Sequence, residues 1–227
     1  MSRYFIIGTG TDVGKTYVAA QLLSEAIKNG HRAAYYKPAM SGNIRVNDSL
    51  IPGDAAYVKE VSDTDQPLDS MCSFIYEPAI SPHLAANEAQ EPVEIDRIKQ
   101  DILELEQNYS LMIMEGCGGI ICPLRYDANT LMQADLIKQL KATTILVADA
   151  GLGTINATVL TTEYLKYKNI PLQGIILNQY DQNNPMHQDN LKLIEELSHH
   201  PVIATLASDS SQLVWRVPSI LEPEVEL

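Results

Sequence analysis

Gly8-Thr-Gly-Thr-Asp-Val-Gly-Lys-Thr16 joins a short apolar run to an amphipathic segment. The run at residues 4–7, Tyr-Phe-Ile-Ile, is aromatic and β-branched, which predicts a buried strand. Over residues 15–29 apolar side chains recur at steps of three and four, which predicts a helix with Gly30 as its C′ residue. A glycine-rich loop between a strand and a helix is where a phosphate-binding P-loop belongs. Its amides face a phosphate, and Lys15 adds a point charge.

The loop departs from the strict P-loop pattern G-x-x-x-x-G-K-S/T. The first glycine of that pattern falls on Thr9, and Gly8 lies one position early. The alternative is a glycine-rich turn that merely connects a strand to a helix. This alternative does not explain why Gly14-Lys-Thr16 stands at the helix start, so we expect nucleotide phosphate here, with the Thr16 hydroxyl on Mg²⁺.

The alternation of strands and helices continues along the chain. Further strands are predicted at residues 31–37 (ended by Pro38), 111–114, 144–148, 174–177 and 201–206, and further helices at 96–107, 130–140, 156–168 and 187–198. Strands that are apolar on both faces and separated by helices predict a three-layer α/β domain, with a mostly parallel sheet covered by helices on both faces. We expect residues 1–227 to form one P-loop NTPase-like domain, with residues 43–90 as an irregular surface excursion and a frayed tail or terminal strap after Val217.

Composition limits the possible partners. With 16 Lys and Arg against 29 Asp and Glu, the 227 residues carry a formal charge of -13, which repels nucleic acid and anionic lipid. No apolar run approaches the roughly 20 residues that span a bilayer, and the N-terminus lacks the features of an export signal. An odd number of cysteines (Cys72, Cys117 and Cys122) without neighbouring His predicts reduced thiols. We expect a cytoplasmic protein that binds neither nucleic acid nor membrane.

A second acidic strand end lies in Leu111-Met-Ile-Met-Glu115-Gly-Cys-Gly-Gly119. An apolar strand that runs into an acid and a glycine-rich turn is typical of a Walker B acid beside a P-loop, where it holds Mg²⁺. The alternative for Glu115 is a solvated acid at a strand end. Asp54, in Pro52-Gly-Asp, has the residue type and position of a helix N-cap, and the local sequence favours that reading over a metal ligand.

Several segments together resemble the ATP-dependent dethiobiotin synthetases of biotin biosynthesis. They occur in the family's order, at close to its spacings, between residues 8 and 178. The segments are Gly8 to Thr16, Tyr36-Lys-Pro-Ala-Met-Ser-Gly42, Asp54-Ala, Ser81-Pro-His, Glu115-Gly-Cys-Gly-Gly119, Leu152-Gly-Thr-Ile-Asn156 and Leu177-Asn178.

The resemblance implies a ligase that joins CO₂ to 7,8-diaminopelargonate, with ATP as co-substrate and Mg²⁺ as cofactor, and closes the ureido ring of dethiobiotin. One amine forms a carbamate, the carbamate attacks the γ-phosphate to give a carbamic-phosphoric anhydride, and the second amine closes the ring with loss of phosphate. No covalent enzyme intermediate is needed. The chemistry requires positioning and charge stabilisation, as phosphoryl transfer usually does.

The same resemblance implies roles for individual residues. Lys15 and Lys37 are the catalytic pair that converges on the carbamate and the γ-phosphate. The Mg²⁺ ligands are Thr16, Asp54 and Glu115, which reverses the local preference for Asp54 as a cap. The implied nucleotide-binding residues are Asp12, Val13, Gly14, Lys15, Thr16, Tyr17, Asp54, Glu115, Gly116, Cys117, Gly118, Asn178 and Gln179. The implied substrate-binding residues are Thr11, Asp12, Ser41, Gly153, Thr154, Ile155 and Asn156.

The substrate carboxylate and the nucleotide base need sites away from the chemistry. Residues 153–156 begin a predicted helix, whose free amides bind carboxylates. In the family this site lies across a two-fold interface, so a homodimer is implied. Asn178 matches the family's asparagine that reads adenine. Gln179 and residues 204–208 depart from the family pattern, and the base preference stays open at this point.

Other nucleotide-binding proteins share this architecture. A switch ATPase of the chromosome-partition or division-site type carries a signature Lys five residues before the P-loop Lys, where this chain has Gly10, and this chain has no basic or amphipathic tail. A synthetase piece of a cobalamin amidotransferase would lack room here for its glutaminase domain. A catalytically inactive nucleotide-binding protein does not explain the combination of Lys37, Asp54 and Glu115.

Overall fold

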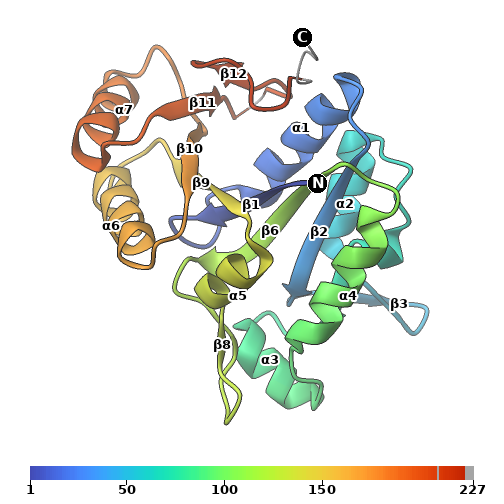
Figure 1. Cartoon of the computed structure of the whole chain (residues 1–227). Helices are drawn as coiled ribbons and strands as arrows, with labels where there is room; N and C mark the ends of the chain where they lie inside the picture. The colour runs from blue at the N-terminus through green and yellow to red at the C-terminus, as the bar shows by residue number, and fades with distance from the viewer. Residues whose placement is uncertain (209, 223–227) are drawn as a thin grey trace.

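Eight strands form one central sheet in the computed structural model, which describes residues 1–208 and 210–222 (Figure 1). Their order across the sheet is β12-β11-β10-β9-β1-β6-β2-β5, and only β12 runs antiparallel to its neighbour. The strands are β1 (Ser2–Gly8), β2 (Ala33–Met40), β5 (Cys72–Ile75), β6 (Leu111–Gly119), β9 (Thr143–Asp149), β10 (Leu172–Asn178), β11 (Val202–Leu206) and β12 (Val214–Trp215). The predicted mostly parallel sheet is confirmed.

Helices cover both faces of this sheet. They are α1 (Lys15–Lys28), α2 (Gly53–Ser62), α3 (Pro82–Ala89), α4 (Ile95–Glu106), α5 (Gln133–Leu140), α6 (Thr154–Tyr167) and α7 (Pro185–Ser198), with a 3-10 turn at Leu68–Ser70. Two small ribbons lie outside the sheet, β3 (Ile44–Val46) with β4 (Ser49–Ile51), and β7 (Pro123–Arg125) with β8 (Leu131–Met132).

The core divides into two clusters because side chains alternate between the two faces of a strand. On β1, Ile6 lies in the cluster with α1 and α2, whereas Phe5 and Ile7 lie in the cluster with α4, α5, α6 and α7. The predicted three-layer α/β architecture is therefore confirmed. Gly30 follows α1 with a φ of 85°, as expected for the C′ residue.

The predicted end of the second strand at Pro38 is wrong, since β2 continues to Met40. Pairing with β6 ends at Tyr36, and from Lys37 onwards the strand pairs with β5 instead. The Lys37 amide donates to the Met71 carbonyl on the β5 side (2.8 Å). Successive amides alternate in direction, so the Pro38 nitrogen faces the side where pairing has ended, and its missing N–H leaves no ladder hydrogen bond unmade.

Two further expectations need correction. Residues 43–90 are not merely an irregular excursion, because they contribute edge strand β5 together with α2 and α3. The helix predicted at 130–140 begins only at Gln133, because the two preceding residues pair as β8 with β7. Strands β5 and β8 have only two to four residues, which is too short to show a periodicity, whereas the helices α2 and α3 were missed in a segment rich in Asp, Ser and Pro.

The described part of the tail after Val217, residues 218–222, forms a strap that contacts α1 and the loop after it. Leu221 is fully buried, and its carbonyl lies 2.5 Å from the His31 Nε2 atom. Ser219 donates to Glu25 on α1 (3.1 Å). Residues 223–227 of the predicted tail lie outside the described residues. Among the helices that the structure describes, none is long and apolar enough to cross a membrane.

Candidate active site

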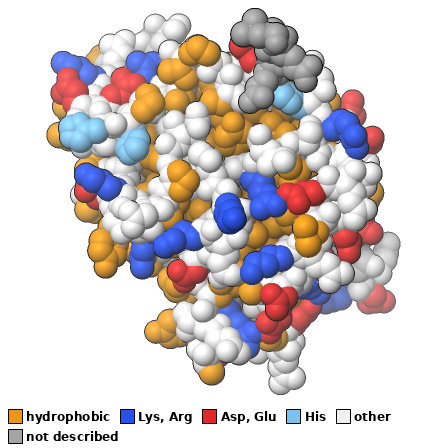
Figure 2. All heavy atoms as spheres, viewed as in Figure 1, with side chains coloured by type: hydrophobic (Ala, Val, Ile, Leu, Met, Phe, Trp, Pro, Cys, Tyr) orange, Lys and Arg blue, Asp and Glu red, His pale blue; other side chains and the backbone are white. Residues whose placement is uncertain are grey.

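A cavity of about 1010 Å³ opens at the carboxyl edge of β1, β2 and β6, where the P-loop begins α1. In open α/β sheets this is the edge at which ligands bind. On the face shown in Figure 2, basic side chains lie close to acidic ones. The cavity also brings both signs of charge together, since two lysines and three carboxylates line it.

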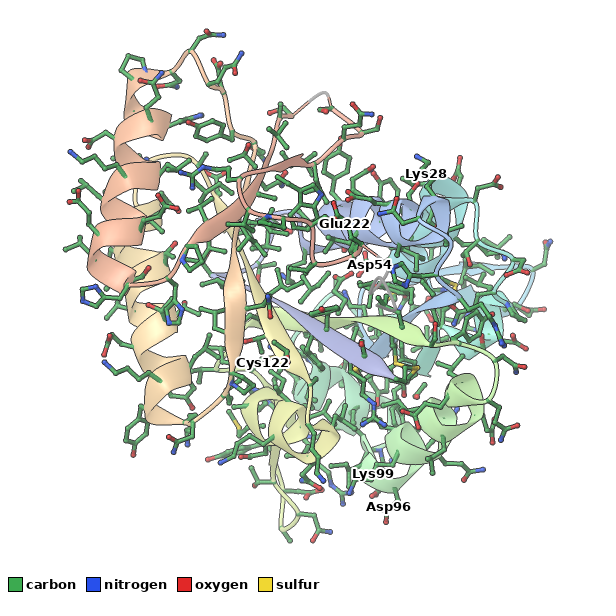
Figure 3. All side chains as sticks on the ribbon, turned by 45° about the horizontal axis from the view of Figure 1, so that its top comes forward. Lys28, Asp54, Asp96, Lys99, Cys122 and Glu222 are labelled. Carbon is green, nitrogen blue, oxygen red and sulfur yellow. The ribbon has the colours of Figure 1, made fainter. Side chains whose placement is uncertain are left out.

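Lys37 lies between two of these carboxylates, Asp54 and Glu115. Its Nζ donates to Asp54 Oδ2 and to Glu115 Oε1, each at 2.6 Å. Glu115 is fully buried on β6, whereas the Asp54 side chain on α2 is 41% exposed. Asp54 is labelled in Figure 3. Burial alone lowers the pKa of Lys37, but Glu115 and then Asp54 outweigh it and raise that pKa above its ordinary value. Lys37 therefore stays charged.

Asp54 does not cap α2. The helix begins at Gly53, Pro52 stands at the N-cap position, and no side chain makes the cap hydrogen bond. The prediction of a cap from local sequence is therefore wrong. Asp54 lies in the first turn of α2, and its carboxylate pairs with Lys37 because β2 and α2 approach each other in the fold. Residue type alone does not reveal this contact.

Glu115 has three hydrogen-bond donors. Its Oε1 accepts from Thr16 (2.8 Å) as well as from Lys37, and its Oε2 accepts from the Tyr35 hydroxyl (2.8 Å). The alternative of a solvated acid at a strand end is therefore wrong for Glu115, which has no exposed surface. The sequence analysis missed Tyr35, because a tyrosine within an apolar strand carries no signal that distinguishes it from a core residue.

Lys15 folds back on the loop that precedes it. Its Nζ donates to the Gly10 carbonyl (3.0 Å), and only 7% of the residue is exposed. Burial is the largest cause that lowers the pKa of Lys15, Glu115 acts against it, and Lys37 adds to the lowering. The two lysines thus face one cavity from β2 and from the P-loop.

Asn178 contacts the P-loop and does not line the cavity. Its Nδ2 donates to the Val13 carbonyl (3.1 Å), and its buried Oδ1 has no hydrogen-bond partner among the described residues. A free acceptor fits the amino group on an adenine edge. Gln179 is exposed with a φ of 56° and lies outside the cavity lining.

The cavity brings together most of the predicted site residues. Those that line it are Thr11, Asp12, Gly14, Lys15, Thr16, Tyr17, Lys37, Ser41, Asp54, Glu115, Cys117 and Gly118. Those that do not are Val13, Gly116, Asn178, Gln179, Gly153, Thr154, Ile155 and Asn156. The sequence analysis assigned no role to Met40, Tyr57, Ala79, Ile80, Ser81, Pro82 and Cys122, which also line the cavity. Met40, Ser81 and Pro82 had a signal, because they belong to the segments at 36–42 and 81–83 that resemble the family.

Gln133 holds the turn that follows Glu115. Its Oε1 accepts from the Cys117 amide (2.6 Å) and its Nε2 donates to the Gly119 carbonyl (3.0 Å). A Cβ at Gly116 would lie 2.4 Å from Gln133 Oε1, so a larger residue there would displace the Gln133 side chain. Gln133 was missed because its partners are main-chain atoms of a distant segment.

Replacing Gln133 by Met is expected to lower the free energy of unfolding by about 1–3 kcal/mol, because two main-chain groups of the turn lose their partners. The measurement is urea unfolding. Gln139→Met on the same helix is the control, since Gln139 is exposed and its side chain accepts from the exposed Lys99. It should change stability by no more than about 0.5 kcal/mol. Equal losses in both variants would contradict the role of Gln133.

The three cysteines are free thiols, and Cys117 and Cys122 line the cavity. Burial raises the pKa of Cys72 and of Cys122 to about 12 from a usual 9.0. The thiolate is the reactive form, and a pKa raised this far leaves about 10³-fold less of it at pH 8. Iodoacetamide should therefore label both residues about 10³-fold more slowly in the native protein than in urea, as followed by mass spectrometry. Equal rates in the two conditions would contradict the burial.

The oxygen donors at the cavity fit Mg²⁺. This ion is usually held by one or two carboxylates, with water and substrate phosphates completing its shell. Thr16, Asp54 and Glu115 supply a hydroxyl and two carboxylates around the Lys37 ammonium. Among the described residues no group of three or more His, Cys, Asp and Glu could hold a metal by itself.

Comparisons with known proteins show what this chain is similar to. A family model described as an AAA domain matches residues 2–212. The ATP-dependent dethiobiotin synthetase BioD of Clostridium novyi is 42% identical over 203 residues, which cover 89% of this chain and 85% of that protein. The protein of the same name from Brachyspira hyodysenteriae is 44% identical over 200 residues, which cover 88% and 89%.

Solved structures extend the comparison to the fold. The ParA family ATPase from Chlorobium tepidum aligns with a TM-score of 0.57 at 17% identity, over 92% of this chain and 86% of that one. At this identity the likeness shows the P-loop NTPase-like fold alone. The two curated relatives are far more similar to this chain in sequence, so it belongs to the family of ATP-dependent dethiobiotin synthetases.

Proposed function

We propose that this protein uses ATP and Mg²⁺ to join CO₂, or bicarbonate as its source, to 7,8-diaminopelargonate and to close the ureido ring of dethiobiotin. One observation carries the proposal: Lys37 is buried between Asp54 and Glu115 in the same cavity as the P-loop Lys15. A reaction that brings a carbamate to a triphosphate gathers negative charge, and buried cations stabilise such charge strongly.

We assign each residue of the site a role from its position in the cavity. Lys15 and Lys37 stabilise the charge that develops between the carbamate and the γ-phosphate, and bound Mg²⁺ adds charge neutralisation on the phosphates. Thr16, Asp54 and Glu115 would hold that ion. Thr11, Asp12 and Ser41 line the cavity and would orient the diamine. Asn178, with its free Oδ1, would receive the adenine amino group.

We also propose a homodimer, with the substrate carboxylate bound at the start of α6. The segment before α6 and the helix itself expose large apolar side chains: Leu152 is 94% exposed, Leu160 63% and Tyr167 77%. Exposed apolar patches of this kind mark interaction surfaces. Residues 153–156 lie beside Leu152, so a partner that covers this face would reach them. A single domain and a cytoplasmic location belong to the same proposal, supported by one sheet that spans residues 2–215 and by three free thiols.

The test is product formation. The full chain is incubated with ATP, Mg²⁺, bicarbonate and 7,8-diaminopelargonate, and dethiobiotin is measured by mass spectrometry. We expect dethiobiotin and phosphate in equal amounts. ATP hydrolysis that is independent of the diamine, without dethiobiotin, would overturn the proposal for a chain shown to be folded. The same assay with CTP and GTP measures the base preference.

A further inference from the structure

Tyr35 holds the Glu115 oxygen that faces away from Lys37. Glu115 Oε1 accepts from Lys37 and from Thr16, whereas Oε2 accepts from the Tyr35 hydroxyl at 2.8 Å. Both groups of this contact are fully buried. A buried carboxylate oxygen needs a donor, because water is not there to supply one.

Tyr35 is itself fixed by its main chain. Its amide donates to Gln66 Oε1 (2.8 Å), and its carbonyl accepts from Gln66 Nε2 (2.9 Å). Gln66 has no exposed surface. The ring packs in the core cluster that contains α1 and α2. The hydroxyl therefore has little freedom to leave Glu115.

We propose that Tyr35 is a positioning residue for Glu115: its hydroxyl holds Oε2, and so directs Oε1 toward Thr16 and the cavity for a divalent cation. This inference rests on the proposed function, which assigns Glu115 to the metal. Without the hydroxyl, Oε2 has no donor and the carboxylate is free to turn toward Lys37. Loss of such an outer partner of a metal ligand typically weakens metal affinity about 10–100-fold.

The chain offers a matched control one residue further along. Tyr36 is also fully buried on β2, but its side chain packs in the opposite core cluster and its hydroxyl bonds Ser73, outside the cavity lining. Tyr35→Phe and Tyr36→Phe each remove one buried hydroxyl from the same strand. A purely structural effect would appear in both variants, whereas an effect on metal binding through Glu115 would appear only in Tyr35→Phe.

The experiment measures Mn²⁺ binding to the full chain by electron paramagnetic resonance, with a non-hydrolysable ATP analogue present. We expect Tyr35→Phe to weaken Mn²⁺ binding at least about tenfold, and Tyr36→Phe to leave it unchanged. Unchanged binding in Tyr35→Phe, or an equal loss in both variants, would overturn the proposal. If Tyr35→Phe unfolds at the assay temperature, both tyrosine variants are measured at a lower temperature at which circular dichroism shows that each is folded.

Glu115→Gln separates this inference from the assignment beneath it. Unchanged Mn²⁺ affinity in Glu115→Gln would overturn the metal role of Glu115 in the proposed function. Loss of affinity in Glu115→Gln but not in Tyr35→Phe would overturn the positioning role alone. In the double variant, Tyr35→Phe should cause no further loss, because Tyr35 acts through the carboxylate.

Discussion

Replacing Lys37 by Gln is expected to lower the turnover number for dethiobiotin by at least ~10²-fold, on the scale of losing one preorganised charge-stabilising group. The amide keeps some hydrogen bonding but carries no charge. Glu115 keeps its contacts with Thr16 and Tyr35, and Asp54 is partly exposed, so we expect the chain to fold. The measurement is steady-state formation of dethiobiotin at saturating substrates.

The matched control for Lys37→Gln is Arg3→Gln. Arg3 is also a strand cation with an anionic partner, Glu106, and it donates to the Leu140 carbonyl (2.7 Å), but it stands at the opposite end of the sheet. Arg3→Gln should leave turnover within about twofold, since the charge it removes lies far from the reacting atoms. A lower turnover number in both variants would show that the loss of any partly buried cation is enough to reduce turnover. Unchanged turnover in Lys37→Gln would reject its catalytic role.

Gly14→Ala is expected to weaken ATP binding by about 10²-fold. A Cβ at Gly14 would lie 2.0 Å from Asn178 Nδ2, and the φ of 86° is unfavourable for any other residue. Either the P-loop or Asn178 must move, and a displacement of about 1 Å in a site can cost about 10²-fold. Because Asn178 bonds the Val13 carbonyl, the shift reaches the loop that presents amides to phosphate. The measurement is titration calorimetry with ATP and Mg²⁺.

Gly30→Ala separates backbone strain from the steric clash. Gly30 has nearly the same φ, 85°, but nothing lies within 4 Å of an added Cβ. It should lose about 1–2 kcal/mol of stability from the left-handed conformation and keep its ATP affinity. Gly14→Ala should show both effects. Equal ATP affinities in the two variants would mean that the contact between Gly14 and Asn178 has no role in nucleotide binding.

Much of the P-loop and of β6 could be predicted because their signals are local. A strand, a glycine-rich loop and a helix follow one another in 27 residues, and Glu115 continues an apolar run. The contact between Lys37 and Asp54 could not be predicted from local sequence. One lies on a strand and the other on a helix, and their contact depends on where α2 packs. Only the resemblance to a family placed them together.

Tyr35 and Gln133 show why the supporting residues escape prediction. Each lies in a segment whose apolar neighbours indicate a core position, and each has its functional partner far away in the chain. Pro38 was misread for a related reason. A proline ends a strand only if its missing N–H is needed, and this depends on which neighbour the strand pairs with at that point.

The mutual pairing of charges in the cavity has a consequence for how a nucleotide arrives. In the free protein the two lysines of the cavity face three carboxylates, and the whole chain carries -13. Long-range attraction therefore does not speed the encounter with a polyanion, and the distant field opposes it. We therefore expect capture to depend on an exchange of partners at short range, in which Lys37 leaves Asp54 and Glu115 for the arriving phosphates.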